Sequence, residues 1–211
     1  MTTRTRLTRA ESKARTRSAL VDAGRRVFLE RGYHGATLEA VADAAGFSTG
    51  AVYSAFDGKS DLFLAVLDAR VADRARQLAR AGASAASAAE QGADLAREFT
   101  AVSKQERNWS LLVIEFWVHA ARDPELRRRF ARRHDALKAA IGQVFDKMLA
   151  RTGERLSLDS DQLAMAAIAL GNGLTLERLA NPDGVPDELF PTLGALIMGG
   201  LAGTAHEGGG T

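Results

Sequence analysis

Apolar residues recur at helical spacing along almost the whole chain, and no stretch shows the alternation that is typical of a strand. Only 4 of the 211 residues are proline, and the alanine-rich composition favours helix throughout. Glycines, prolines and capping residues mark the ends of the helical stripes. We therefore expect an all-α fold. The long helices are predicted over residues 12–31, 59–80, 95–106, 109–122, 124–151, 160–180 and 187–201.

The segment between the first two long helices is divided by turn and capping residues. Gly32 ends the first helix, and Thr37 can cap a short second helix that Gly46 breaks. Ser48 can cap a third short helix, which the Asp57-Gly58 turn follows. Three helices with a glycine turn between the second and third are typical of a helix-turn-helix unit.

The basic residues are concentrated at the start of the chain. Eight lysines and arginines stand against two acidic residues in the first 26 positions, although the whole chain has a net charge of only +2. A basic end on a mildly acidic body indicates contact with nucleic acid, and a solvated N-terminus that binds nothing is an equally good interpretation of charge alone. If this segment binds DNA, Arg4 and Arg6 are candidates for an arm that lies on phosphates or in a minor groove.

The stretch "FSTGAVYSAF" has the features of a helix that reads DNA. A major groove about 12 Å wide admits a helix closely only if the residues at its start are small. Val52 and Phe56 can anchor such a helix from its inner side, and Tyr53 can reach a backbone phosphate. Lys59 adds a charge at the start of the next helix, where anions are favoured. The small residues at the helix start are Ser48, Thr49, Gly50 and Ala51.

Residues 25–67 resemble the DNA-binding domain of the tetracycline-repressor (TetR) family of bacterial regulators. The resemblance depends on many landmarks at fixed spacing, among them Gly32-Tyr33, Ala45-Gly46, Val52-Tyr53 and Lys59. It implies an all-helical homodimer of about nine helices, in which the first three helices bind DNA. Transferred to this sequence, the DNA contacts are Thr37, Ser48, Thr49, Gly50, Tyr53 and Lys59, with Ala51 near a base edge.

The same resemblance implies the domain organisation. A DNA-binding domain with its basic arm is expected over residues 1–58, and a helical domain that binds an effector and dimerises over residues 59–203. The glycine-rich end of the chain predicts a flexible tail over residues 204–211.

A small-molecule site is expected among the middle helices, because the family builds its cavity there and such pockets are mostly apolar. Most apolar residues on these helices are simply core, so each candidate competes with that interpretation. A dense arginine cluster over residues 127–133 is either a solvated face or a site for an acidic ligand such as an acyl-coenzyme A. The candidate effector contacts are Phe116, Trp117, His119, His134, Met148 and Asn172.

The last two helices carry apolar stripes that can close a four-helix interface between two subunits. The alternative is that both helices bury their stripes within one subunit. The candidate interface residues are Leu163, Ala167, Leu170, Leu174, Leu189, Leu193, Leu196 and Ile197.

Taken together, these patterns predict a regulator that binds double-stranded DNA at a palindromic operator and is released by a small-molecule effector. A DNA-binding architectural protein without an effector is the alternative. Enzymatic motifs are absent: there is no cysteine, no HExxH, no phosphate-binding glycine loop, and the four histidines have no metal-ligand spacing. We expect no cofactor, no metal and no membrane contact. No apolar run approaches about 18 residues and there is no signal peptide, so a cytoplasmic protein is expected.

Overall fold

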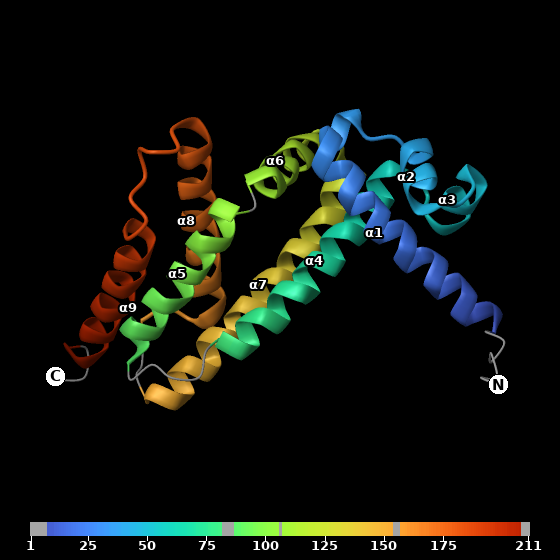
Figure 1. Cartoon of the computed structure of the whole chain (residues 1–211). Coiled ribbons are helices and arrows are strands. Elements are labelled where there is room, and N and C mark those ends of the chain that lie inside the picture. The colour runs from blue at the N-terminus through green and yellow to red at the C-terminus, as the bar shows by residue number, and fades with distance from the viewer. Residues whose placement is uncertain (1–7, 82–86, 106, 154–156, 208–211) are drawn as a thin grey trace, which may run out of the picture. The chain divides into compact units, whose positions relative to one another are not determined.

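The computed structural model describes residues 8–81, 87–105, 107–153 and 157–207, and within them it contains nine helices and no strand (Figure 1). The all-α expectation is therefore confirmed. The helices are α1 (Arg9–Gly35), α2 (Leu38–Ala45), α3 (Thr49–Ala55), α4 (Lys59–Ala81), α5 (Ala88–Gln105), α6 (Arg107–Ala121), α7 (Pro124–Thr152), α8 (Ser160–Ala180) and α9 (Leu189–Glu207).

Most helix boundaries follow the local signals. Helix α8 has the predicted bounds, because Asp159 and Gln162 form a capping box at its start. Helix α1 begins earlier than predicted, since Thr8 and Glu11 form another capping box ahead of Arg9. Hydrogen bonds from the Thr8 backbone and hydroxyl hold the pKa of the Glu11 carboxyl below its usual value.

Two further boundaries differ from the prediction by six or more residues. Helix α5 begins at Ala88, seven positions before the predicted start, because the Ser87 hydroxyl accepts from the Glu90 N–H at 3.2 Å and caps the helix. Helix α9 continues to Glu207, so the first four residues of the predicted tail over 204–211 are helical. Residues 208–211 lie outside the described residues.

The chain forms two compact units. The first takes the chain up to Arg70 together with residues 111–130, and the second takes residues 71–110 and the chain from Ala131 onward. The boundaries between the units fall inside α4, α6 and α7. The first unit therefore contains most of α6 as well as the three N-terminal helices. The predicted division at residue 58 concerns function, and it stays a prediction.

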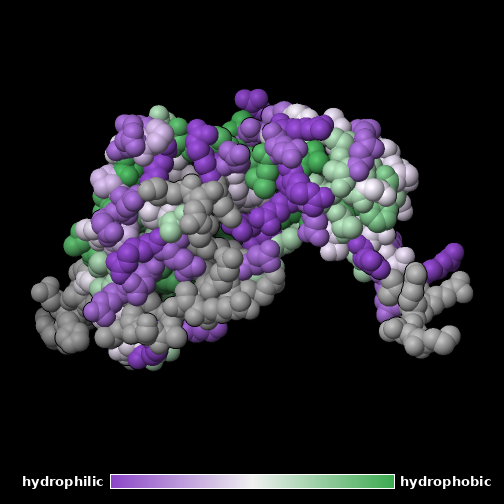
Figure 2. All heavy atoms as spheres, viewed as in Figure 1, coloured by the Kyte–Doolittle hydropathy of each residue, from purple (hydrophilic) through white to green (hydrophobic). Residues whose placement is uncertain are grey.

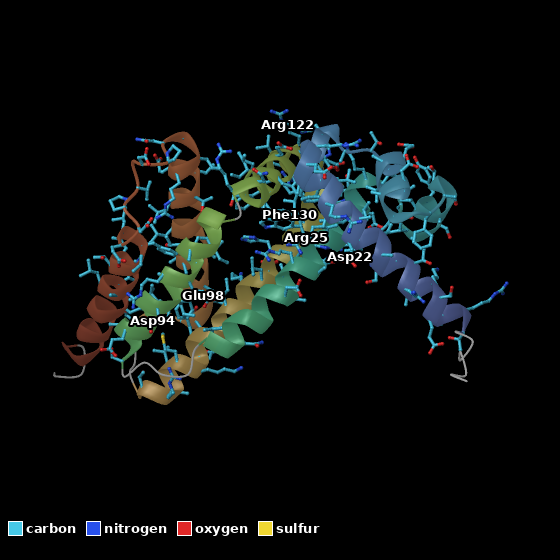
Figure 3. The ribbon with its side chains drawn as sticks, viewed as in Figure 1. Asp22, Arg25, Asp94, Glu98, Arg122 and Phe130 are labelled. Atoms are coloured by element: carbon cyan, nitrogen blue, oxygen red, sulfur yellow. The ribbon has the colours of Figure 1, made fainter. Side chains whose placement is uncertain are left out.

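The core of the first unit is aromatic. Phe63 packs edge-on against Phe28, with ring centroids 5.0 Å apart, and lies 4.3 Å from the ring of Phe116 on α6. Tyr33 packs against the same group, 5.4 Å from Phe63 and 5.1 Å from Phe116. Phe130 of α7, which is labelled in Figure 3, stacks edge-on against Phe116 at 5.6 Å. These contacts join α6 to α1 and α4. We call α1, α2, α3 and the first turn of α4 the head of the protein.

The core of the second unit is aliphatic, with Phe145, Met148, Leu163, Ala164 and Met198 at its centre. Helices α5 and α9 approach closely at two glycines. A Cβ on Gly92 would lie 3.0 Å from the Cγ of Met198, and a Cβ on Gly194 would lie 3.3 Å from the Gly92 carbonyl oxygen. In the described part of the chain, no helix is both long and apolar enough to cross a membrane.

Candidate nucleic-acid interface

Side-chain caps fix the two short helices of the head. The Thr37 hydroxyl accepts from the Ala40 N–H at 3.2 Å at the start of α2, and the Ser48 hydroxyl accepts from the Ala51 N–H at 3.3 Å at the start of α3. Between them Gly46 ends α2 in the left-handed conformation, with φ of 73°. The predicted caps are thus confirmed. Both hydroxyls keep their own proton for another acceptor.

Helix α3 has a buried side and an exposed side. Val52 and Phe56 are buried, as predicted, and fix the helix to the head. Tyr53 points to solvent with 58% of its surface exposed, which is unusual for so large an aromatic side chain. In the space-filling view the lobe of α2 and α3 shows mostly white and pale green residues, which are intermediate to weakly hydrophobic (Figure 2).

Gly50 lies on the exposed side of α3, and the fold gives no internal reason for a glycine there. A Cβ at Gly50 would meet only the Ser48 hydroxyl oxygen, at an ordinary 3.8 Å. Its φ is also not in the left-handed region. Glycine inside a helix costs about 1 kcal/mol relative to alanine. Packing within the described part of the chain therefore does not explain the missing side chain, whose absence leaves room for the close approach of another molecule.

The ammonium of Lys59, which the sequence predicts only as a phosphate contact, also binds groups within the head. It donates to the carbonyl oxygens of His34 and Ala36, at 3.2 and 3.1 Å, and lies 4.9 Å from the centre of the Tyr33 ring. Burial lowers the pKa of this ammonium below its ordinary value. Two of its three N–H groups are therefore used to fix the loop before α2. The third is the one that can bind a phosphate.

Two further arginines of α1 lie against the helix-turn-helix. The guanidinium of Arg17 stands 4.7 Å from the centre of the Phe56 ring, at the end of α3. Arg26 donates to the Ala44 carbonyl oxygen at 3.2 Å. In the sequence these two arginines contribute only to the basic charge of the N-terminal segment, because their contact partners are 18 or more positions away. Arg4 and Arg6 lie outside the described residues.

The candidate effector residues fall into both compact units. Phe116, Trp117 and His119 are in the first unit, where Phe116 is fully buried in the aromatic core. Met148 is in the core of the second unit, and His134 and Asn172 are half-buried there. Their role in binding an effector stays a prediction.

The candidate dimer residues divide by exposure. Leu196 and Ile197 on α9 are exposed, with Leu196 at 65%, whereas Leu163 is buried in the core of its own subunit. The other candidates are half-buried, namely Ala167, Leu170, Leu174, Leu189 and Leu193. Sequence reasoning missed two exposed apolar side chains on α8, Met165 and Leu176.

The arginine cluster of α7 is partly neutralised. Arg128 pairs with Glu125, and Arg129 pairs with Asp61 of α4. Arg127 and Arg132 are exposed. In the part of the chain that the structure describes, no group of three acidic or histidine side chains could hold a metal ion.

Comparison with known proteins agrees with this geometry. The N-terminal part matches the family model of bacterial regulatory proteins of the tetR family over residues 20–66, which places the head in the helix-turn-helix class of regulators. A second model, the C-terminal domain of BetI-type transcriptional repressors, matches residues 88–195, more than half of the chain. The chain belongs to the TetR family of transcriptional regulators.

The sequence similarity to curated relatives covers about a quarter to a third of this chain. The HTH-type transcriptional repressor BepR of Brucella suis biovar 1 (strain 1330) is 44% identical over 62 residues, which is 29% of this chain and 29% of BepR. The chain spans about a quarter to a half of the length of the curated relatives it matches.

Solved structures share the fold over nearly the full length. A TetR-family transcriptional regulator from Rhodococcus sp. has a TM-score of 0.70 at 23% identity, covering 90% of this chain and 99% of that one. The regulator FadR from Bacillus subtilis, solved in complex with stearoyl-CoA, has a TM-score of 0.68 at 16% identity and covers 87% and 98%. The prediction of a nine-helix fold of this family is confirmed within the described residues.

Proposed function

We propose that this protein is a transcriptional regulator that binds double-stranded DNA through the exposed side of α3 and is released by a small-molecule effector. The observation that carries the proposal is the composition of α3. The inner side chains of this helix, Val52 and Phe56, are buried. Its start carries the hydroxyls of Ser48 and Thr49, and its outer side carries Gly50 and the exposed Tyr53. This is the arrangement that a helix needs to enter a major groove and touch base edges and phosphates.

Within this proposal the residues have separate roles. Thr49, Gly50 and Ala51 lie at the start of α3, where a recognition helix meets base edges. Ser48, Tyr53, Thr37 and the remaining N–H of Lys59 bind phosphates. Arg4 and Arg6 add contacts from the N-terminal arm, which also bind phosphates or a minor groove.

The protein acts as a homodimer in this proposal, with α8 and α9 at the interface. Four large apolar side chains on these two helices are exposed in a single subunit: Met165, Leu176, Leu196 and Ile197. A second copy would remove them from water. A two-fold dimer places two recognition helices on half-sites about one helical turn, or 34 Å, apart, so the operator is an inverted repeat.

Selection of bound duplexes from a random DNA pool, run near 50 and 200 mM salt, tests the proposal. An inverted repeat recovered at both salt concentrations is the expected result. Recovery of DNA without a common sequence, and only at the lower salt concentration, would contradict sequence-specific regulation. It would favour an architectural protein that binds any duplex nonspecifically.

An effector weakens operator binding only by the difference in its affinity for the free and DNA-bound conformations. A coupling of about 1–3 kcal/mol would weaken binding roughly 5- to 150-fold. Stearoyl-CoA is the first compound to test, because the structure of FadR from Bacillus subtilis was solved in complex with it. In this chain the exposed side chains of Arg127 and Arg132 are available to bind the acidic groups of such a ligand. The readout is operator affinity by fluorescence anisotropy, followed by a wider set of metabolites.

A further inference from the structure

Helix α1 is broken near its end. Gly32 has φ of 70° and ψ of 174°, outside the helical region, and the chain then makes one more turn before α2. The break removes the ordinary acceptor of the following amide, because a helical N–H bonds to the carbonyl four residues earlier only if the intervening residues are helical. The Tyr33 N–H would be left without a partner in a buried place.

A carboxylate from a distant helix satisfies this amide. Tyr33 N–H donates to the Oε2 of Glu115 on α6 at 2.7 Å, although the two residues are 82 positions apart. The carboxylate also fills the space beside Gly32, where an added Cβ would lie 2.9 Å from the same oxygen. The broken backbone and the carboxylate therefore fit each other closely.

The Tyr33 side chain is fixed at the same place. Its hydroxyl shares a hydrogen bond of 2.7 Å with the Ser60 hydroxyl at the start of α4, and its ring lies 4.9 Å from that of His119, one turn after Glu115 on α6. Burial raises the pKa of this phenol, so it stays neutral. The loop that follows, held by Lys59, leads directly to Thr37, the cap of α2.

We propose that Glu115 is a positioning residue of the DNA-binding head: its carboxylate holds the broken turn of α1 and thereby sets the position of α2 and α3 relative to α6. This inference rests on the proposed function, since it names the residue through which α6 keeps the head able to bind DNA. Glu115 and the two residues that it contacts here, Gly32 and Tyr33, lie within the first compact unit.

The direction in which DNA affinity changes distinguishes a positioning role of Glu115 from a purely electrostatic one. Removal of a carboxylate near a DNA-binding surface raises DNA affinity if only long-range electrostatics matters. Positioning predicts the opposite, because E115A leaves the Tyr33 N–H unsatisfied and releases the turn. A Gln at 115 keeps an oxygen that accepts from Tyr33 N–H while losing the charge.

The experiment compares E115A and E115Q with E125A as the matched control. Glu125 is an exposed carboxylate of the same unit whose salt bridge is local to α7, with Arg128. Operator affinity is measured by fluorescence anisotropy on the selected duplex. We expect E115A to bind the operator at least about tenfold more weakly. The variant loses the hydrogen bond from Tyr33 N–H to a charged acceptor, and the free energy of such a bond corresponds to about a tenfold change in affinity or more. E115Q is expected within about threefold of the wild type, and E125A equal or tighter.

A distance measurement tests the positioning itself without DNA. The chain has no cysteine, so Glu39→Cys on α2 and Val118→Cys on α6, both exposed, give two unique sites for spin labels. Labelled protein is diluted into unlabelled protein. The distribution of label distances should be narrow in the wild-type and E115Q backgrounds and broader or shifted in E115A.

Unchanged operator affinity together with an unchanged distance distribution in E115A would overturn the proposal, and so would tighter binding by E115A. If E115A fails to fold by circular dichroism, E115D replaces it, because its carboxylate is one methylene too short to reach Tyr33; E115D binding as tightly as E115Q would then overturn it. If the wild-type protein selects no patterned DNA, the proposed function fails, and the label distances still decide whether Glu115 fixes the head.

Discussion

Lys59→Met separates two roles of a single ammonium. The substitution keeps the length and the apolar stem of the side chain and removes the charge that binds the His34 and Ala36 carbonyls. Each hydrogen bond to a charged group contributes about 1.5–3 kcal/mol when buried, and water replaces much of that in this half-buried site. The contact with the Tyr33 ring adds about 0.5–1 kcal/mol. We expect the free energy of unfolding to fall by about 2 kcal/mol.

Urea unfolding followed by circular dichroism measures this change as a lower midpoint with an unchanged slope. Lys147→Met, at an exposed lysine of α7, is the control and should leave the midpoint unchanged. In DNA binding, the slope of log affinity against log salt should fall in magnitude by about 0.9 for each subunit, or about 1.8 for the dimer, if the third N–H of Lys59 binds a phosphate. A Lys59→Met protein as stable as the wild type would refute the reasoning about the carbonyl contacts.

Four further substitutions test the head and the dimer. Gly32→Ala should lower the free energy of unfolding by about 1–3 kcal/mol or more, because the positive φ is strained and the new Cβ meets Glu115; an unchanged urea midpoint would contradict this. Tyr53→Phe should weaken binding of all duplexes alike with no loss of stability, as anisotropy on the operator and a scrambled duplex would show. Thr49→Ala should instead alter base preference in a repeated selection, and uniform weakening would refute its role at base edges. Leu196→Glu should give a helical monomer in analytical ultracentrifugation, and a persisting dimer would move the interface elsewhere.

Local signals account for what the sequence predicts well. The Thr37 and Ser48 caps and the left-handed Gly46 each depend on residues within a few positions, so their effect on the backbone is readable directly. The buried and exposed sides of α3 follow from helical periodicity in the same way, with Val52 inside and Tyr53 outside. The helix-turn-helix is therefore predictable in detail.

Contacts between distant segments explain what was missed. Lys59 was assigned to phosphate alone, because carbonyl acceptors 23 and 25 positions earlier leave no mark in the sequence. The role of Glu115 is likewise not readable from the sequence, since its partner is the backbone of Tyr33 and backbone groups have no sequence signature. Gly32 was expected to end α1, and the chain instead makes a further turn after it that α6 holds in place.

An amide footprint on isotope-labelled protein tests the central claim, that the exposed side of α3 reads DNA, most directly. The selected duplex and a scrambled duplex of the same composition are titrated, and transverse-relaxation-optimised NMR spectra follow each backbone amide. We expect the selected duplex to shift residues 48–53 strongly and the scrambled duplex to shift them little. Equal shifts with both duplexes, or shifts confined to the arginine cluster at residues 127–133, would contradict the account.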